Sequence, residues 1–552
     1  MATEGLLSAE TDQDVARFLA NFPPTEWGYS FASLLPQDSE FESHTKELDL
    51  VKEKVKDMLM QSRKELTENI EFVNCLCRLG VSYHFESEII EQLSHIFISL
   101  PKILEENDYS LYILTLLFRV LRQHGYKMPC DVFNKFKDSN GEFKKCMTAD
   151  VRGLLSLYEA TFLSVHGEDI LDEALAFTRQ HLETLAEKSS PHLARHIRNA
   201  LHLPFHHAPE RLEILQYICF YEGEKSMNET LLKFAKLDFN RLQLLYRKEL
   251  GLLSRWWKDI NLTEKLPYTR DRIVEAYAWA AGIIIDPQFS RARLQFAKHL
   301  ILISVMDDTY DSYGTFDELK HFTAALQRFT FEPTTELPEY MKFLYNILWN
   351  FFQETEKDET QGCACKTSFA REMLKEVARS YFAEAEWYND GVLPTFDEFM
   401  QFGLVSSTFD YHASAFFLGV EDLGMKEIIW LRDNPTIAKT AKLFGRLFND
   451  IAIREDEQKK GDYPSAIKCY MNDHDVSLEK AKEDILKMLE DGWKDMNEEL
   501  MKPTIVPKIL TKFSINFARM SDFSYRGGID KYTCGTELKE SVKKLTIFPL
   551  QI

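Results

Sequence analysis

Turn-forming residues are few in this sequence, with 22 glycines and 18 prolines among 552 residues. Long elements joined by few sharp turns are therefore favoured. The longest uncharged apolar run, Ala276 to Ile285, is far too short to cross a membrane. Residues 1–14 contain acidic but no basic side chains, unlike the arginine-rich presequences that direct proteins to organelles. The 9 cysteines are an odd number without a regular framework, which predicts reduced thiols rather than disulfides.

Acidic residues outnumber basic ones, and 87 Asp and Glu against 66 Lys and Arg give a net charge of −21. A chain this acidic repels phosphate backbones, so we expect no nucleic-acid partner. Hydrophobic residues make up 45% of the chain, which is enough for sizeable cores, and the length predicts two or more domains. The 40 Phe residues also suit a cavity that encloses an apolar ligand.

Hydrophobic residues recur at helical spacing along most of the chain, and few stretches alternate as strands do. We therefore predict an all-α protein. Amphipathic helices fill residues 41–221 after an irregular beginning, and residues 221–226 have the composition of a linker. The predicted domains are residues 1–227 and residues 228–552.

Three carboxylates close one predicted helix, at Asp307, Asp308 and Asp311, after the apolar run of residues 294–306. The negative end of the helix dipole makes each acid there unfavourable by roughly 0.3–1 kcal/mol. The spacings i, i+3 and i, i+4 also bring like charges together. A bound cation would offset both costs, and hard oxygen ligands without a nearby His or Cys favour Mg²⁺. A solvated acidic helix end is the alternative, which the preceding apolar run disfavours.

A second polar stripe runs along a helix predicted from about Thr436 to Lys460. Helical spacing places five residues on one face: Arg446, Asn449, Ile453, Glu457 and Lys460. This face could hold a metal together with an anion that bridges it. The alternative is an ordinary solvated face with ion pairs.

Two arginines flank one residue in the motif Arg270-Asp271-Arg272, which precedes an aromatic helix around Trp279. Guanidinium groups so spaced can clamp a diphosphate through bidentate hydrogen bonds. The alternative is a charged helix start on the surface, and the motif alone does not decide between them.

Together these motifs resemble the class I terpene synthases of plants. Three elements carry the resemblance, namely RxR at residues 270–272, DDxxD at 307–311 and the third motif at 449–457. Arg17 followed at a fixed distance by Trp27 also resembles an N-terminal motif of the family, so the resemblance covers about residues 15–552. It implies a non-catalytic, capping helical domain at residues 1–227 and a metal-binding catalytic domain of the class I isoprenoid-synthase fold at residues 228–552. The DxDD motif of protonation-initiated cyclases is absent from the sequence.

The resemblance implies a role for each matching position. Three Mg²⁺ ions are expected, with Mn²⁺ as a possible substitute. Their implied ligands are Asp307, Asp308 and Asp311 for two ions, with Asn449 and Glu457 for the third. The residues implied to bind the diphosphate are Arg270, Arg272, Arg446 and Lys460. The residues implied to surround the cation or to move protons near it are Trp279, Phe409, Tyr525, Asp530 and Tyr532.

The sequence departs from the family pattern at Ile453, where the third motif normally has Ser or Thr. An Ile side chain cannot coordinate a hard cation, so we expect one ligand fewer at the third metal site and weaker Mg²⁺ affinity. Phe18 also replaces the usual Arg or Pro of the N-terminal motif, and we expect little effect on the fold from this change.

The expected activity is that of a carbon–oxygen lyase, a sesquiterpene synthase that ionises farnesyl diphosphate and cyclises the carbocation. This substrate follows from the cytosolic location expected for a chain whose family motif begins near its first residue. We expect a monomer. Alternatives within the family are a C10 substrate, a linear alcohol product, or a synthase-like binding protein weakened at Ile453. A chain-elongating prenyltransferase is disfavoured, because it would need a second DDxxD motif and a shorter chain.

Overall fold

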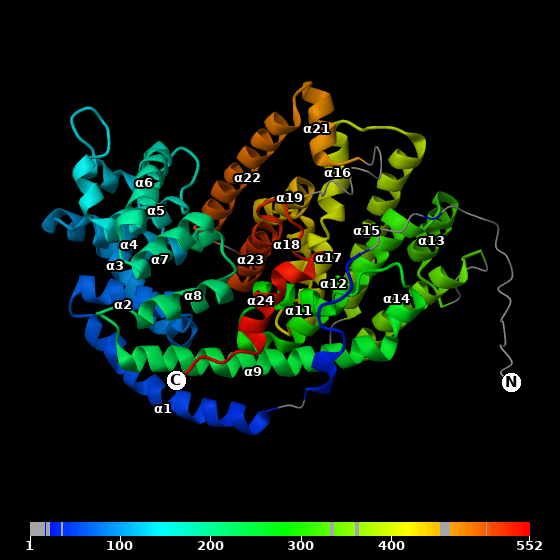
Figure 1. Ribbon diagram of the computed structural model, residues 1–552, viewed down its shortest axis with the longest axis horizontal. Coiled ribbons are helices and arrows are strands. Elements are labelled where there is room, and N and C mark those ends of the chain that lie inside the picture. The colour runs from blue at the N-terminus through cyan, green and yellow to red at the C-terminus, as the bar shows by residue number, and fades with distance from the viewer. Residues whose placement is uncertain are drawn as a thin grey trace.

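The computed structural model describes Arg17 and residues 22–34, 37–331, 336–358, 364–452, 464–503 and 505–552. In these ranges the chain is helical, and an isolated bridge between Lys137 and Phe143 is the one β-type pairing. The predicted all-α class is confirmed (Figure 1). No helix in the described part combines the length and the apolar content needed to cross a bilayer.

The first group of helices lies on the left of Figure 1. Its members are α1 (Asp38–Ser62), α2 (Leu66–Arg78), α3 (Glu86–Glu106), α4 (Leu111–Gln123), α5 (Val151–Thr161), α6 (Asp169–Lys188), α7 (Pro191–His202) and α8 (Glu210–Glu222). Short 3-10 turns accompany them at η1 (Ser30–Ser33), η2 (Ser82–Phe85), η3 (Cys130–Phe136), η4 (Lys145–Ala149) and η5 (Phe205–His207).

The second group forms a larger assembly on the right of Figure 1. Its members are α9 (Glu229–Ile260), α10 (Leu262–Lys265), α11 (Ile273–Ile283), η6 (Pro287–Phe289), α12 (Ser290–Asp308), η7 (Thr309–Tyr313), α13 (Phe316–Arg328), α14 (Glu339–Asp358), α15 (Ala364–Asp390), α16 (Phe396–Ser406), α17 (Phe409–Gly419), α18 (Met425–Arg432), α19 (Thr436–Ile451), α21 (Ala466–His474), α22 (Leu478–Leu500), α23 (Lys508–Tyr525) and α24 (Gly535–Thr546).

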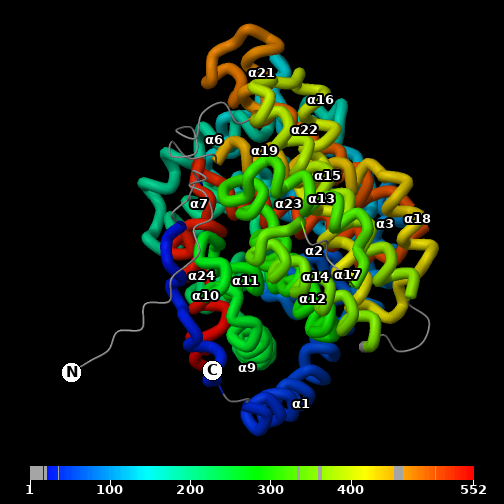
Figure 2. Tube along the Cα trace, turned by 90° about the vertical axis from the view of Figure 1, so that its right-hand side faces the viewer, coloured from blue at the N-terminus to red at the C-terminus, as the bar shows by residue number. Residues whose placement is uncertain are grey.

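The long helix α9 runs beneath both groups and contributes to two hydrophobic cores (Figure 1). Its residues up to Phe239 pack in the core of the first group, and its residues from Leu242 onward pack in the core of the second. Helix α1 lies along α9, as Figure 2 also shows. Phe31 from the N-terminal segment packs in the second core, so the chain crosses between the two groups. The boundary at residues 227 and 228 stays a prediction.

A buried ion pair joins α9 to α12 within the second core. Arg293 and Glu249 have side chains that are 0% and 2% exposed, and two guanidinium nitrogens lie 2.6 and 2.8 Å from the carboxylate. The Tyr277 hydroxyl donates to the same carboxylate, and the guanidinium also donates to the Ile284 and Asp286 carbonyls. This network fixes the start of the helix that carries the acidic motif.

Candidate active site

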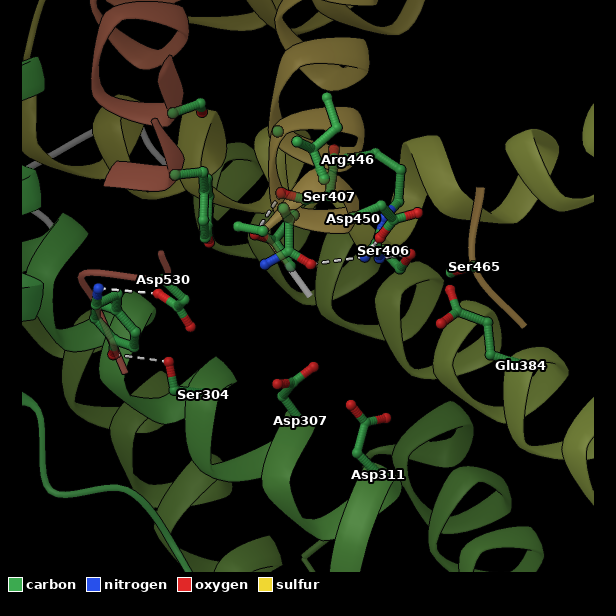
Figure 3. A pocket seen from close by; sticks show the side chains of 18 of the residues that line it. Ser304, Asp307, Asp311, Glu384, Ser406, Ser407, Arg446, Asp450, Ser465 and Asp530 are labelled. Atoms are coloured by element: carbon green, nitrogen blue, oxygen red, sulfur yellow. Dashed lines mark hydrogen bonds and ion pairs between the residues drawn. The ribbon is translucent and has the colours of Figure 1, made fainter. Parts of the chain in front are cut away.

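A cavity of about 500 Å³ lies among α12, α15, α17, α19 and α23, a volume typical of sites for small organic ligands. Figure 3 shows its polar end. Asp307 and Asp311 extend into it side by side from one helix, Glu384 faces them from the side, and Arg446 lies opposite. These residues come from positions far apart in the sequence.

The acidic wall depends on a local change of helix type. Helix α12 ends at Asp308 and continues as a π-helical turn, η7, which Gly314 closes by donating its amide to the Thr309 carbonyl at 2.8 Å. A Cβ on Gly314 would lie 2.6 Å from the Leu319 side chain and 2.9 Å from that carbonyl, so no larger residue fits without movement. Such wide turns are frequent at functional sites. The turn keeps Asp311 exposed beside Asp307, which is 31% exposed.

Asp308 differs from the other two carboxylates of the motif, because it is buried and accepts the backbone amide of Arg270 as well as pairing with its guanidinium. The backbone amide of Arg270 donates to Asp308 Oδ2 at 2.7 Å, and Arg270 Nε lies 2.8 Å from Oδ1. Arg270 Nη2 also lies 2.6 Å from Asp307. Asp308 therefore holds an arginine at the edge of the cavity, while Asp307 and Asp311 present carboxylate oxygens to its interior.

The facing wall comes from the end of α19. Arg446 Nη2 donates to Asn449 Oδ1 at 2.8 Å and also pairs with Asp450. The Asp450 carboxylate accepts the Ala466 amide at 2.7 Å, which ties α19 to the start of α21. The predicted helix to Lys460 is too long, because α19 ends at Ile451.

The remaining positions of the third motif, namely Ile453, Glu457 and Lys460, lie outside the described residues. Within the described part, no three His, Cys, Asp or Glu side chains come close enough to hold a metal by themselves. The side chains of Asp307, Asp311 and Asn449 nevertheless offer oxygen ligands around one cavity. This donor set fits Mg²⁺, which prefers oxygen and completes its shell with water and substrate phosphates.

The predicted aromatic wall is assembled in part. Trp279, Tyr525 and Tyr532 line the cavity. Asp530 lines it too, as Figure 3 shows. The Tyr532 hydroxyl is 2.8 Å from Ser304 Oγ, and Asp530 Oδ1 accepts the Tyr532 amide at 2.9 Å. Both side chains are thereby held at the turn that follows α23.

Among the predicted site residues that the structure describes, two do not line the cavity. Arg272 is buried and donates to the carbonyls of Thr533 at 2.8 Å and Pro23 at 2.6 Å. It therefore joins the N-terminal segment to the turn before α24 in this conformation. Phe409 packs behind the wall, with its ring centroid 5.1 Å from that of Phe517, which does line the cavity.

The structure adds cavity residues that the sequence patterns did not indicate. Glu384 is buried, and burial raises its pKa to about 7 despite the opposing charge of Arg446. Glu384 shares one face of α15 with Val377 and Tyr381. A charged residue on this otherwise apolar face is the sequence pattern that could have indicated it as a site residue. Further unpredicted lining residues are Phe22, Ser406, Ser407, Thr408 and His412.

The N-terminal segment is anchored beside this cavity. Arg17 makes two 2.8 Å contacts with Glu318 and lies over the rings of Tyr313 and Tyr340, at 4.7 and 5.2 Å. The indole of Trp27 donates to Glu275 at 3.0 Å. Both ends of the N-terminal motif therefore bind the second group of helices.

Comparison with known proteins agrees with this geometry. Residues 258–495 match the family model for the metal binding domain of the terpene synthase family, and residues 26–201 match its N-terminal domain. The structure resembles limonene synthase in complex with 2-fluorolinalyl diphosphate, with a TM-score of 0.90, 30% identity and coverage of 97% of this chain and 100% of that one. It also resembles isoprene synthase from grey poplar in complex with three Mg²⁺ ions and dimethylallyl-S-thiolodiphosphate. For that pair the TM-score is 0.85 and the identity 32%, over 96% of this chain and 99% of that one.

These matches define an all-α, two-domain protein with a metal-binding C-terminal domain. The chain belongs to the terpene synthase family, whose members are lyases that act on prenyl diphosphates. Its sequence is 99% identical, over the full length of both chains, to Terpene synthase 5 of Ricinus communis.

Proposed function

We propose that this terpene synthase ionises farnesyl diphosphate and cyclises the carbocation to a C15 product. One observation carries the proposal: Asp307 and Asp311 face Arg446 across a cavity that Asn449 also lines (Figure 3). Aromatic and aliphatic side chains, among them Trp279, Phe517 and Ile303, line other parts of the same cavity. A charged end can bind the diphosphate and its metals, while an apolar end can enclose the hydrocarbon. The cavity of about 500 Å³ offers room for a folded isoprenoid chain.

The polar end of the cavity would bind the metal ions and the diphosphate. Asp307, Asp311, Asn449 and Glu457 would hold the metal ions, for which we propose three Mg²⁺. When bound, these ions neutralise the charge that develops on the departing diphosphate. Arg446 and Arg270 would donate hydrogen bonds to the same oxygens.

The apolar end protects the cation after ionisation. The ring of Trp279 lies near those of Phe517 and Tyr525, with centroid distances of 6.0 and 6.4 Å. These ring faces attract a cation and exclude water, which would otherwise capture it as an alcohol. Since ring positions decide how the chain folds, the product is determined at this end.

Substitution of Ile453 tests the proposed third metal site. Ile453→Ser adds a hydroxyl oxygen, and we expect the Mg²⁺ concentration at half-maximal rate to fall on the order of tenfold. Ile453→Val is the matched control, because it changes the size of the side chain without adding a ligand. A Mg²⁺ titration of both variants that gives the wild-type curve would show that position 453 does not contact the metal.

The proposal is tested with purified full-length protein, a Mg²⁺ series and the C10, C15 and C20 prenyl diphosphates. Diphosphate release measures ionisation, and gas chromatography–mass spectrometry identifies the products. We expect metal-dependent cyclic C15 products from farnesyl diphosphate. Turnover of the C10 or C20 substrate alone would overturn the proposed substrate, and no diphosphate release from any of them would favour a binding protein disabled at Ile453. Cytosolic location and the monomeric state stay predictions, which fluorescent tagging and sedimentation can test.

A further inference from the structure

A histidine is built into the apolar part of the cavity wall. His412 lies in the second turn of α17, is 2% exposed and lines the cavity. Its ring stacks on Phe296, with centroids 4.7 Å apart and planes 27° apart, and lies 6.3 Å from the ring of Phe517. Imidazole is an unusual choice for such a position, because an aliphatic side chain would fill the same space without a polar atom.

Neighbouring hydrogen bonds select the tautomer of this imidazole. The Thr408 hydroxyl donates its proton to the Ser407 carbonyl at 2.7 Å. The same hydroxyl oxygen lies 3.1 Å from His412 Nδ1 and can therefore only accept from it. Nδ1 thus carries the proton, and Nε2 keeps its lone pair. Nε2 is buried and has no hydrogen-bond partner among the described residues.

We propose that His412 Nε2 is the base that ends the reaction by taking a proton from the carbocation. This inference rests on the proposed function, which supplies the cation. A C–H bond on a carbon adjacent to the cationic centre breaks, and its electron pair forms the C=C bond of the product. The proton forms a new N–H bond at Nε2. The resulting imidazolium then passes its proton to the released diphosphate or to water as the products leave.

The surroundings suit a base that acts late and does not interfere earlier. Burial lowers the pKa of His412 to about 3, with a smaller contribution from His299. The imidazole is therefore neutral before catalysis and leaves the metal-bound diphosphate undisturbed at the polar end. A carbocation is acidic enough to protonate even this weak base. The ring of Phe296 stabilises the imidazolium while it exists. The low pKa of His412 then favours release of the proton.

Other titratable groups in the cavity are less suited to this role. Glu384 lies at the polar end, where burial raises its pKa and the charge of Arg446 opposes that change. Asp530 has one carboxylate oxygen occupied by two backbone amides. His412 belongs to the aromatic part of the wall, where the hydrocarbon portion of the substrate is expected.

The first test is His412→Leu in the full-length protein with farnesyl diphosphate and Mg²⁺. We expect diphosphate to be released still, since ionisation precedes the proposed step, and the comparison is therefore made on the distribution of products. We expect the share of the main wild-type alkene to fall at least fivefold, replaced by isomers with the double bond elsewhere or by water-derived alcohols. The ring skeleton should be retained. New skeletons would indicate that His412 acts by shape, and an unchanged product profile would show that it is not the base; either result overturns the proposal.

His299→Leu is the matched control, because His299 is also a buried neutral histidine but does not line the cavity. Its product profile should equal that of wild type. Thr408→Val removes the acceptor for Nδ1 and should move the profile toward that of His412→Leu, whereas Thr408→Ser should not. If the His412→Leu variant does not fold, the product distribution of His412→Asn is measured in its place. A wild-type enzyme that releases no diphosphate would refute the proposed function instead, so the two failures are distinguishable.

Discussion

Asp307→Asn and Asp311→Asn are each expected to lower kcat/KM for the prenyl diphosphate by about 10²–10³-fold. Both carboxylates extend into the cavity, and an amide is a weaker ligand without charge. The stabilisation lost is that of the departing diphosphate, so the rate of ionisation falls together with metal affinity. Diphosphate release across a Mg²⁺ series measures both quantities in one experiment.

Asp317→Asn is the control for this prediction. Asp317 is an exposed residue in the first turn of α13, six positions beyond the motif and away from the cavity. The same chemical change there should leave kcat/KM within about twofold of wild type. If the three variants behave alike, the acidic pair is not the metal site.

The variant Asp308→Asn distinguishes two roles for Asp308: a direct metal ligand, as the sequence motif implies, or a residue that positions Arg270, as the structure indicates. All three motif carboxylates resemble metal ligands, but Asp308 accepts from the Arg270 backbone and pairs with its guanidinium. If Asp308 acts through Arg270, the variant should bind Mg²⁺ with nearly normal half-saturation but show a raised KM for the prenyl diphosphate. A Mg²⁺ requirement raised as much as in Asp307→Asn would make Asp308 a direct ligand.

Local patterns were sufficient to predict the all-α class and the common side of a helix on which Asp307 and Asp311 lie. Asp307 and Asp311 are one helical turn apart, so their shared direction follows from spacing alone. The π-helical turn that carries Asp311 was not predictable in the same way, because a wide turn leaves the order of residues unchanged. The end of α19 at Ile451 was also missed, since the polar side chains keep a helical spacing up to Lys460 in the sequence. The Asp450 contact with Ala466 depends on the next element and cannot be read from that spacing.

Distant contacts decided which predicted residues reach the cavity. Arg272 matches the family motif, yet its carbonyl partners Thr533 and Pro23 are 261 and 249 residues away in sequence. Glu384 and His412 lie on helix faces that are otherwise apolar and belong to no acidic or basic motif. Their presence in the cavity follows from how α17 packs against α12 and how α15 packs against α17 and η7, which spacing within one helix cannot show.

The second large effect is expected on stability, at the buried pair of Arg293 and Glu249. Glu249→Gln keeps the shape of the side chain but leaves the Arg293 guanidinium without a counter-charge inside the core. Removing one member of such a pair costs about 3–5 kcal/mol, because the remaining charge stays desolvated. We expect the free energy of unfolding to fall by that amount and the acidic helix to lose its fixed start. Urea unfolding followed by circular dichroism measures the change.

Lys248→Gln, one position earlier, provides the matched control, since Lys248 pairs with Asp38 where the side chains are 45% and 63% exposed. Solvent-exposed pairs contribute little, so its unfolding free energy should change by less than about 1 kcal/mol. The double variant Glu249→Leu with Arg293→Met removes both charges and should be more stable than Glu249→Gln, because no unpaired charge remains. If Glu249→Gln unfolds at the same urea concentration as Lys248→Gln, the pair does not hold α9 and α12 together, and the helix that presents Asp307 must be positioned by its apolar contacts alone.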